Sequence, residues 1–313
     1  MKTNQIFVIV PCLDEESSIK QTIREIRRFL PDSSIVVVDN GSKDHTREIA
    51  RSEGVKVLVE PKKGKGFAVR NALSRMPSDC DVVFITDGDD TYSAEPVLEA
   101  VSLIRDAGYD MIIGKRESNS EDESPRGKIF RLGHATGNRL LTRVFRLLFP
   151  VEITDTLSGW RVMSRGFAKS FTGGASGFEI ETELNAHAYL LKCGVKEIPV
   201  LYKGRGKESY SKLKTIPDGL RILRMNLHLF RSERPYFAFV LTALPWSLMS
   251  LFLLLRSLND YFRTGLVPHF PSLIAGIGSF TVSALLWVTG MILERVRMSR
   301  EASARALYSA STI

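Results

Sequence analysis

The sequence has little cysteine, few histidines and almost no glutamine, and each shortage excludes a class of site. The three cysteines stand far apart with no C-x-x-C pair, which argues against a disulfide framework and a zinc site and favours a reducing compartment. None of the five histidines has H-E-x-x-H spacing, so histidine-based metal catalysis is not expected. The only glutamines are Gln5 and Gln21. Any motif that requires a glutamine after residue 21 is therefore excluded.

Two common motifs for binding phosphate or calcium are also missing. No segment has the G-x-x-x-x-G-K-[ST] spacing of a Walker A loop, and the acidic run at 87–90 lacks the further ligands of an EF-hand. The chain carries an excess of positive charge: the 43 Lys and Arg against 35 Asp and Glu give a formal charge of +8. That balance is compatible with anionic substrates, nucleic acid or an anionic membrane surface, and it does not choose among them.

Apolar β-branched runs alternate with helix-like segments over the first 114 residues. This alternation predicts βαβ units and an α/β domain, with a mostly parallel sheet and helices on both faces. The chain of 313 residues is long enough for one such domain plus an appendage. The first run, 6–10, is too short for a signal peptide and is interpreted as a strand. Strands are expected near 5–10, 34–39, 55–59, 81–86 and 110–113, and helices near 16–30, 43–53, 65–76 and 94–107.

Several carboxylates follow the fourth expected strand. Asp87, Asp89 and Asp90 come directly after the apolar run 81–86, at the kind of strand end where α/β enzymes bind ligands. Clustered carboxylate oxygens suit Mg²⁺ or Mn²⁺ bridging a diphosphate, because such an ion takes carboxylate and phosphate oxygens in one shell. The segment therefore indicates nucleotide chemistry, with an acidic surface turn as the alternative.

Other polar residues are expected at the same edge of the sheet. Pro11 and Glu15 follow the first strand, and Asp39 and Gly41 follow the second. An acidic side chain in such a loop can hold a ribose hydroxyl or a base. Lys65 lies between two glycines where a helix begins, which offers a cation and helix N-terminal amides to a phosphate.

The chain changes character near residue 214. Residues 214–235 are expected to form an amphipathic basic helix suited to a membrane interface, with packing in a core as the alternative. Two uncharged stretches follow, 236–255 and 270–293, of 20 and 24 residues, and each is long enough to span about 30 Å of hydrocarbon. We therefore expect a globular domain at 1–213, the interfacial helix, two transmembrane helices, and a small polar tail at 294–313 with a disordered end.

Arginines gather on one side of the expected membrane spans. The positive-inside rule then predicts an integral membrane protein whose globular domain and C-terminal tail are both cytoplasmic. The flanking arginines are Arg221, Arg224, Arg231 and Arg234 before the first span and Arg295, Arg297, Arg300 and Arg305 after the second, whereas the 14-residue connection carries only Arg256 and Arg263.

A series of short segments follows in order along the chain: Pro11-x-x-x-Glu15, Val38-Asp-Asn-Gly-Ser42, Gly64-Lys-Gly66, Asp87-Gly-Asp89, Gly114-Lys-Arg116, Asp155-Thr-Leu-Ser-Gly-Trp-Arg161, Phe178-Glu-Ile-Glu181 and Ser211-Lys-Leu213. Together these segments resemble the family 2 glycosyltransferases of GT-A fold, a Rossmann-like α/β architecture. The resemblance covers about residues 4–235 and is closest to the polyprenyl-phosphate (dolichyl-phosphate) glycosyltransferases, among which a two-helix C-terminal membrane anchor also occurs.

The resemblance implies roles for individual residues. Glu15 and Asp39 are similar to the family's carboxylates that bind uridine or guanosine, with Pro11, Gly41 and Lys65 beside them in the nucleotide site.

The resemblance also implies a metal and reaction centre. Asp87 and Asp89 are similar to the D-x-D pair that holds metal and diphosphate. Arg116 is similar to a basic residue that the family uses near the phosphates, and Asp155 to its acidic residue at the reaction centre. A cationic loop that closes over donor diphosphate and acceptor phosphate is matched by Arg205 and Lys212.

The chain departs from the family pattern in two places. Close relatives have D-x-D-x-Gln with the glutamine as a metal ligand, whereas this chain has Thr91. The third ligand is therefore open among Asp90, Thr91 and water. The segment 205–213 is longer than the relatives' loop, which leaves the alignment of Arg205 open.

Two motif positions have ordinary structural interpretations as well. Trp160 is expected to pack in the core rather than serve as a platform for the acceptor. Glu179 and Glu181 either take part in the site or simply favour the N-terminal end of a helix, where acidic residues are stabilised.

These features predict a membrane-anchored glycosyltransferase that moves a sugar from a UDP- or GDP-linked sugar to a polyprenyl or dolichyl phosphate. The resemblance implies inversion and a Mg²⁺ or Mn²⁺ cofactor. A phosphate acceptor is already anionic near neutral pH, so a strong general base is unnecessary.

Other functions remain as alternatives. A polysaccharide or other lipid-directed family 2 enzyme is disfavoured because no Q-x-x-R-W element exists. A non-catalytic sugar-nucleotide-binding scaffold is disfavoured by the intact Asp87, Asp89 and Asp155. Nucleic acid is not expected as a partner, since only net charge favours it, and a homo-oligomer is compatible with the sequence.

Overall fold

The chain forms two compact units. The first comprises Met1–Asn226 together with Ala304–Ile313, and the second comprises Leu227–Ser303. The computed structural model describes residues 5–118, 142–143, 145–146, 149, 153–203, 224, 227–228 and 230–312.

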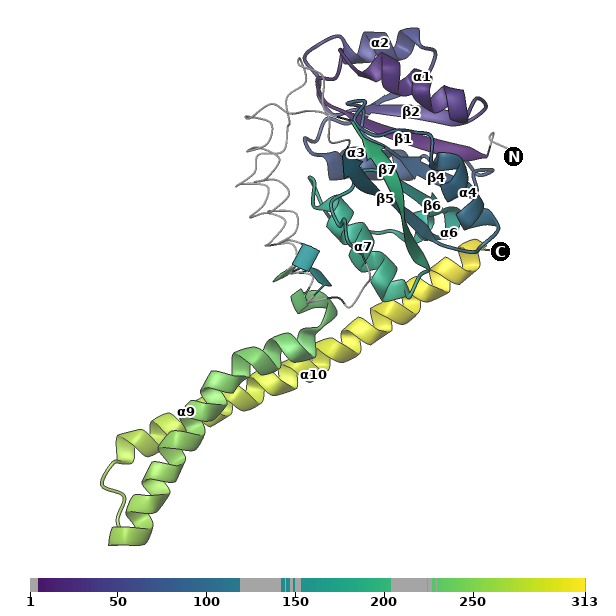
Figure 1. Ribbon diagram of the computed structural model, residues 1–313. Helices are drawn as coiled ribbons and strands as arrows, with labels where there is room; N and C mark the ends of the chain where they lie inside the picture. The colour runs from purple at the N-terminus through teal and green to yellow at the C-terminus, as the bar shows by residue number, and fades with distance from the viewer. Residues whose placement is uncertain are drawn as a thin grey trace. The chain divides into compact units, whose positions relative to one another are not determined.

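The first unit is built on a seven-stranded sheet of order β3-β2-β1-β4-β6-β5-β7 (Figure 1). Neighbouring strands are parallel, except that β6 runs antiparallel to both β4 and β5. The expected mostly parallel sheet and its first five strands are confirmed. The strands are β1 (Ile6–Cys12), β2 (Ser34–Asp39), β3 (Lys56–Val59), β4 (Val82–Ile85), β5 (Met111–Ser118), β6 (Arg161–Ser164) and β7 (Val195–Tyr202).

Helices cover both faces of this sheet, which is why its central strands are apolar without alternation. Successive residues of β1 point to opposite faces: Val8 belongs to one hydrophobic core and Ile9 to the other. The first core is shared with α1, α2 and α4, and the second with α3, α6 and α7. The helices are α1 (Ile19–Phe29), α2 (Thr46–Ser52), α3 (Lys65–Leu73), α4 (Val97–Arg105), α6 (Arg165–Ser170) and α7 (Ile180–Leu191).

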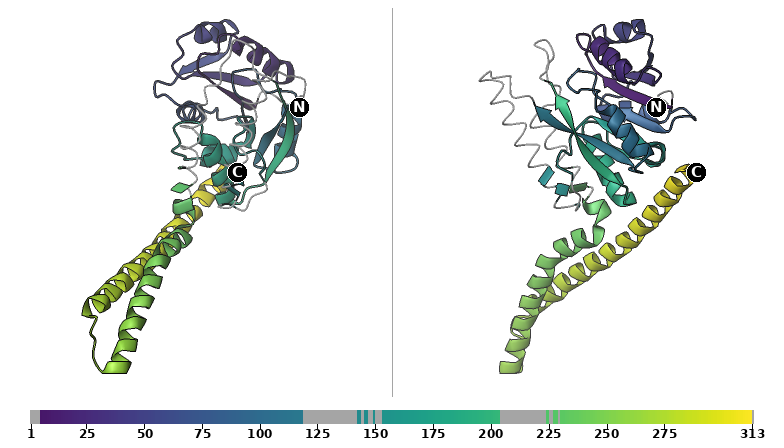
Figure 2. Two further views of the ribbon diagram at one scale, coloured as in Figure 1. Left: turned by 60° about the vertical axis from the view of Figure 1, so that its left-hand side comes forward. Right: turned by 45° about the vertical axis from the view of Figure 1, so that its right-hand side comes forward.

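The second unit is a helical hairpin made by α9 (Pro235–Thr264) and most of α10 (Phe270–Thr312), which lie side by side (Figures 1 and 2). Both helices are long and apolar enough to cross a membrane, and only 11% and 22% of their most apolar stretches are buried. Such low burial is unlike a soluble core helix. Residues 256–264 continue α9, so the connection is much shorter than the sequence indicated.

Small residues spaced seven apart line the contact between the two helices. Because a side chain of one or two heavy atoms lets the backbones approach, small residues are typical of packed membrane helices. Ser250 donates a hydrogen bond to the Gly276 carbonyl at 2.9 Å, and the Ser247 and Ser283 hydroxyls lie 2.6 Å apart. The buried small residues with this spacing are Ala243, Ser250 and Ser257 on α9 and Gly276, Ser283 and Gly290 on α10.

The end of α10 returns to the first unit. The expected disordered tail is instead helical as far as Thr312. Tyr308 packs against the second core of the sheet and hydrogen-bonds Asp110. The hairpin is therefore an excursion that leaves the globular unit and comes back to it.

His187 on α7 is a half-buried residue that packs against aromatic side chains. Its ring packs edge-on against Phe167 and Phe171, with Nε2 2.9 Å from the Ser170 hydroxyl. Burial lowers the pKa of His187 from 6.5 to about 4. The unfolded chain therefore binds more protons between these two values, so the folded state loses stability as the pH falls below 6.5.

We expect the free energy of unfolding to drop by about 2 kcal/mol more between pH 8 and pH 5 in the wild-type chain than in His187→Gln, which cannot titrate. Denaturant unfolding of the full chain in detergent, followed by circular dichroism at both pH values, measures the difference. Equal pH dependence of the two chains would show that His187 takes up no proton when the chain unfolds in this pH range.

Candidate active site

Most of the residues expected to bind nucleotide and metal lie at one edge of the sheet, where β1, β2 and β4 end. These three strands are parallel, so their carboxyl ends face the same way. The strand order reverses between β1 and β4, and doubly wound sheets bind ligands in the crevice at such a point. The predicted residues at or just after these strand ends are Pro11, Glu15, Asp39, Gly41, Asp87, Asp89 and Thr91.

Asp39 shapes the loop after β2. Its fully buried carboxylate accepts hydrogen bonds from the backbone N–H groups of Gly41 and Ser42, both at 3.1 Å, and from Arg47 Nε at 2.6 Å. Gly41 has φ +91°, a left-handed conformation that favours glycine. Asp39 thus fixes the turn at this edge of the sheet, and Arg47 is a cation there that the sequence did not single out.

Glu15 connects the first strand loop to the acidic turn. The Ser18 hydroxyl lies 3.2 Å from Glu15 Oε2 and 3.0 Å from the Gly88 carbonyl. The Glu15 backbone N–H donates to Thr46 Oγ1 at 2.8 Å. Pro11 pairs within the sheet, one residue before β1 ends. The β1, β2 and β4 loops are therefore joined into one rigid edge.

The acidic turn after β4 is held at both of its D-x-D carboxylates. Asp87 Oδ1 lies 2.5 Å from Lys65 Nζ, and Asp89 Oδ1 accepts the Thr91 hydroxyl at 2.5 Å. Thr91 therefore contacts the second carboxylate and orients it. A Cβ at Gly159 would lie only 2.4 Å from Asp87 Oδ2, so this glycine is required for the Asp155–Arg161 segment to approach the turn.

Lys65 lies at the start of α3, as the sequence indicated, but its ammonium contacts two carboxylates. Besides Asp87, it lies 2.6 Å from Glu181 Oε1 on α7. Burial alone would lower the pKa of Lys65, but Asp87 and Glu181 raise it, so the side chain stays charged. Glu181, whose role the sequence left open, therefore contacts the same lysine as Asp87.

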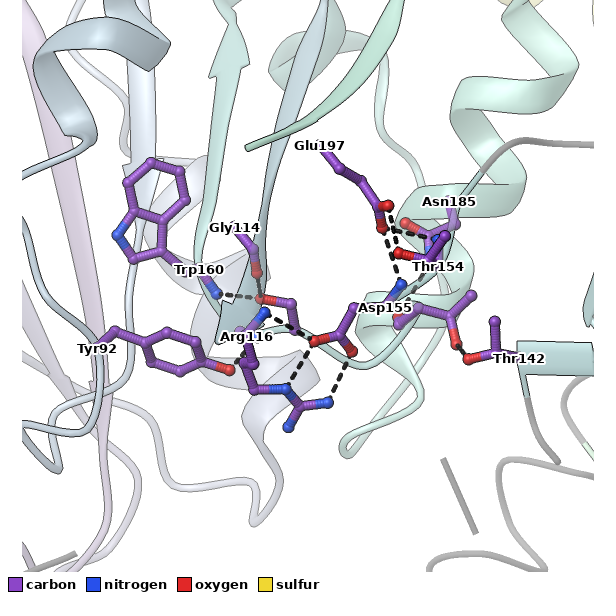
Figure 3. A network of polar contacts seen from close by, with 12 residues as sticks. Tyr92, Gly114, Arg116, Thr142, Thr154, Asp155, Trp160, Asn185 and Glu197 are labelled. Carbon is purple, nitrogen blue, oxygen red and sulfur yellow. Dashed lines mark hydrogen bonds and ion pairs between the residues drawn. The ribbon is translucent and has the colours of Figure 1, made fainter. Parts of the chain in front are cut away.

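Arg116 and Asp155 form a bidentate ion pair (Figure 3). Arg116 Nε and Nη2 each lie 2.7 Å from a different oxygen of Asp155, and the Arg116 Cζ lies 5.7 Å from the centre of the Tyr202 ring. The third guanidinium nitrogen, Nη1, lies outside the pair. Such a forked contact fixes the orientation of an arginine head group more firmly than a single bond does.

Further residues hold the segment that carries Asp155. Glu197 on β7 accepts hydrogen bonds from the backbone N–H groups of Thr154 and Asp155, both at 2.8 Å (Figure 3). The guanidinium of Arg161 is fully buried and donates to Asn185 Oδ1 at 2.6 Å, as well as to two carbonyls of the segment. Burial lowers the pKa of Arg161 to about 10, so it remains a cation at neutral pH.

One further expectation is confirmed, and another falls on residues that the structure does not describe. Trp160 is fully buried and packs on Phe84 with ring centres 5.1 Å apart, which confirms a core role. Arg205 and Lys212 lie outside the described residues, as does most of the expected interfacial helix at 214–235.

The donor chemistry of the acidic turn suits a hard divalent cation. Among the residues that the structure describes, no three His, Cys, Asp or Glu side chains gather into a metal site. Asp87 and Asp89 offer carboxylate oxygens on one turn, which Mg²⁺ and Mn²⁺ accept as ligands. They fit part of such an ion's shell, and oxygens of a diphosphate and of water would have to complete it.

The fold and this acidic edge define a glycosyltransferase of GT-A type. Residues 7–171 match the family model for glycosyl transferase family 2, and the chain belongs to that family. A low-salt glycan biosynthesis hexosyltransferase, Agl6 of Haloferax volcanii, is 32% identical over 223 residues, which are 70% of this chain and 52% of Agl6. The chain thus spans about half the length of that relative.

Two further similarities are to a relative that is matched over nearly its whole length and to a solved structure. A dolichyl-phosphate hexose transferase of Haloferax volcanii is 29% identical over 231 residues, covering 74% of this chain and 96% of that protein. The crystal structure of glucosyl-3-phosphoglycerate synthase from Mycobacterium tuberculosis with Mn²⁺, uridine-diphosphate-glucose and phosphoglyceric acid has a TM-score of 0.56 at 20% identity, covering 72% of this chain and 79% of that one. At this identity the likeness shows the fold.

Proposed function

We propose that this enzyme transfers a sugar from a UDP- or GDP-linked donor to a polyprenyl or dolichyl phosphate at a membrane surface, with inversion and with Mg²⁺ or Mn²⁺ as cofactor. In the reaction, a phosphate oxygen of the lipid forms a bond to the anomeric carbon, while the bond from that carbon to the donor diphosphate breaks. The nucleoside diphosphate then leaves.

The observation that carries the proposal is the engagement of Asp155. Both of its carboxylate oxygens accept from Arg116, so this acid is suited to orienting a cation and poorly suited to removing a proton. An acceptor hydroxyl needs a base, whereas a phosphate monoester is already ionised near pH 7, its second pKa being about 6. The site therefore favours an acceptor that arrives as an anion.

The donor side is supported by the acidic turn and the loops around it. Asp87 and Asp89 would hold the divalent ion, which when bound supplies charge neutralisation for the departing diphosphate. Glu15 and Asp39 lie at the adjoining strand ends, where a nucleoside would be recognised. The Mycobacterium tuberculosis neighbour binds Mn²⁺ and uridine-diphosphate-glucose, and the Haloferax volcanii relative's name gives a dolichyl-phosphate substrate.

Membrane anchoring is supported by the apolar hairpin. The chain leaves the globular unit before Leu227 and returns to it after Ser303, so both ends of a spanning hairpin would lie on the same side. The arginines that flank the two spans favour the cytoplasm for that side. A lipid phosphate presented at the same surface would then be concentrated near the enzyme.

Incubating the purified full chain with a panel of UDP- and GDP-sugars and a short polyprenyl phosphate should yield a lipid whose mass has risen by one sugar. The matched control is the polyprenol of equal length without its phosphate. We expect its rate to be at least about a thousandfold lower, because a hydroxyl needs a base, and both oxygens of Asp155 already accept from Arg116. Mass spectrometry of the lipid fraction measures both. Comparable glycosylation of polyprenol and polyprenyl phosphate would contradict the proposal.

A further inference from the structure

The lysine at the start of α3 occupies one oxygen of the first D-x-D carboxylate. Lys65 Nζ lies 2.5 Å from Asp87 Oδ1 and 2.6 Å from Glu181 Oε1, and its side chain is only 10% exposed. An ammonium and a divalent cation compete for the same carboxylate oxygens, since both are attracted by the same charge. The contact therefore bears directly on how a metal would reach Asp87.

The position of Lys65 is fixed by its backbone. The Gly66 N–H donates to the Ser176 carbonyl at 3.0 Å, and a Cβ at Gly64 or Gly66 would lie within 2.3 Å of the neighbouring backbone. Glu183 in turn holds the loop before α7, accepting from the Gly174 and Ala175 N–H groups. Because α3 and α7 are joined so tightly, the contacts of the lysine are a property of the fold.

Lys65 contacts two carboxylates directly, and the buried Arg161 guanidinium also attracts one of them, Glu181. In the described structure Glu181 Oε2 is buried without a hydrogen-bond partner. Glu181 belongs to no metal cluster of the described residues, and its direct contact in the site is with Lys65. Glu181 therefore offers the ammonium a second carboxylate besides Asp87.

We propose that Lys65 competes with the divalent cation for the carboxylate of Asp87. Glu181 binds the ammonium when the metal takes its place at Asp87. The donor diphosphate weakens the competition, because it is a further anion that Lys65 can contact. The consequence is that metal and nucleotide bind together, and the metal alone binds weakly. This inference rests on the proposed function, because it takes the donor to be a nucleotide sugar bound through a metal at Asp87.

The affinity for Mn²⁺ without nucleotide should change in opposite directions when Lys65 and Glu181 are replaced. In Lys65→Met the competitor is gone, and we expect Mn²⁺ to bind roughly tenfold more tightly than in the wild type. In Glu181→Gln the ammonium has Asp87 as its one remaining carboxylate, so Mn²⁺ should bind about threefold or more weakly. The free Mn²⁺ spectrum in electron paramagnetic resonance, titrated with full-length protein in detergent, measures both without any turnover.

Two further variants control for charge and folding. Lys63→Met removes one positive charge from the same loop at an exposed position, and it should leave Mn²⁺ affinity within about twofold of the wild type. Lys65→Met combined with Glu181→Gln removes one charge of each sign from the buried cluster. This double variant avoids leaving two unpaired carboxylates, and it should also bind Mn²⁺ roughly tenfold more tightly than the wild type.

Adding nucleotide tests the coupling. With saturating UDP or GDP, whichever binds, Mn²⁺ affinity should rise in both chains, because diphosphate oxygens join the metal's shell. The rise should be about tenfold larger in the wild type than in the double variant, since only the wild type also loses the competition from Lys65. Wild-type affinity for Mn²⁺ in both Lys65 variants, or tighter binding in Glu181→Gln, would overturn the inference. A wild-type affinity that neither nucleotide changes would instead count against the proposed donor, and the titrations with Mn²⁺ alone would still decide the role of Lys65.

Discussion

Replacing Asp89 by Asn is expected to lower kcat/KM for sugar transfer by roughly a thousandfold or more while leaving the fold intact. The carboxylate is buried on the turn after β4, and its Oδ1 accepts from the hydroxyl and the N–H of Thr91. Asparagine keeps the shape and one oxygen acceptor, so the contacts with Thr91 can persist. What it loses is the negative charge that would neutralise and position a divalent cation.

Asp79→Asn provides the matched control for Asp89→Asn. Asp79 is an exposed carboxylate close to the opposite, N-terminal end of β4, and its replacement should change kcat/KM by less than about twofold. Initial rates at limiting Mn²⁺ or Mg²⁺, together with circular dichroism of each variant, measure the effect. Turnover of Asp89→Asn at the wild-type rate under limiting metal would rule out the metal role.

The central part of the fold could be predicted from the sequence because burial on both faces leaves a direct signature. The run Ile35–Val38 has no polar residue, and it forms the buried strand β2. The edge of the sheet was harder to predict. β7 is partly exposed and pairs with β5, which lies far earlier in the chain. β6 has only four residues and begins at Arg161, the last residue of the Asp155–Arg161 motif.

In the candidate site, too, local features could be predicted from the sequence and contacts between distant segments could not. The sequence could predict the positions of Glu15, Asp39 and Asp87, because each lies at or shortly after the end of a strand. Strand ends are local features of the sequence. The partners of these residues come from distant elements. Glu197 approaches Asp155 only because β7 is parallel to β5 in the register that sets Glu197 beside Ile113, and no local pattern encodes that register.

The contact of Lys65 with Glu181 shows why a correct position does not fix a role. The glycines on either side of Lys65 indicated a phosphate-facing loop, but they are required because the loop before α7 packs against their backbone. That packing places a second carboxylate against the lysine. The functional interpretation of Lys65 therefore depended on a tertiary contact between α3 and α7.

The ion pair between Arg116 and Asp155 leads to the second large effect. Arg116→Met should lower kcat by roughly a thousandfold with little change in donor affinity, if the guanidinium acts on charge that develops during transfer. Arg116→Lys should recover only a small part of the activity, because an ammonium cannot reproduce the forked contact with Asp155. Steady-state kinetics, with donor affinity from equilibrium binding, separate the two quantities.

Asp155→Asn then decides whether the acid works through the arginine. We expect it to lower kcat by roughly a hundredfold, because Arg116 loses the charge that orients it, and we expect Arg116→Met combined with Asp155→Asn to be no slower than Arg116→Met alone. The reason is that a residue acting only through Arg116 has nothing left to act on once that side chain is gone. Fully additive losses would instead assign Asp155 a contact of its own with the reacting groups. The pH profile provides the complementary check: in Asp155→Asn the acid limb should still follow ionisation of the acceptor phosphate near pH 6, whereas loss of that limb would identify Asp155 as the titrating base.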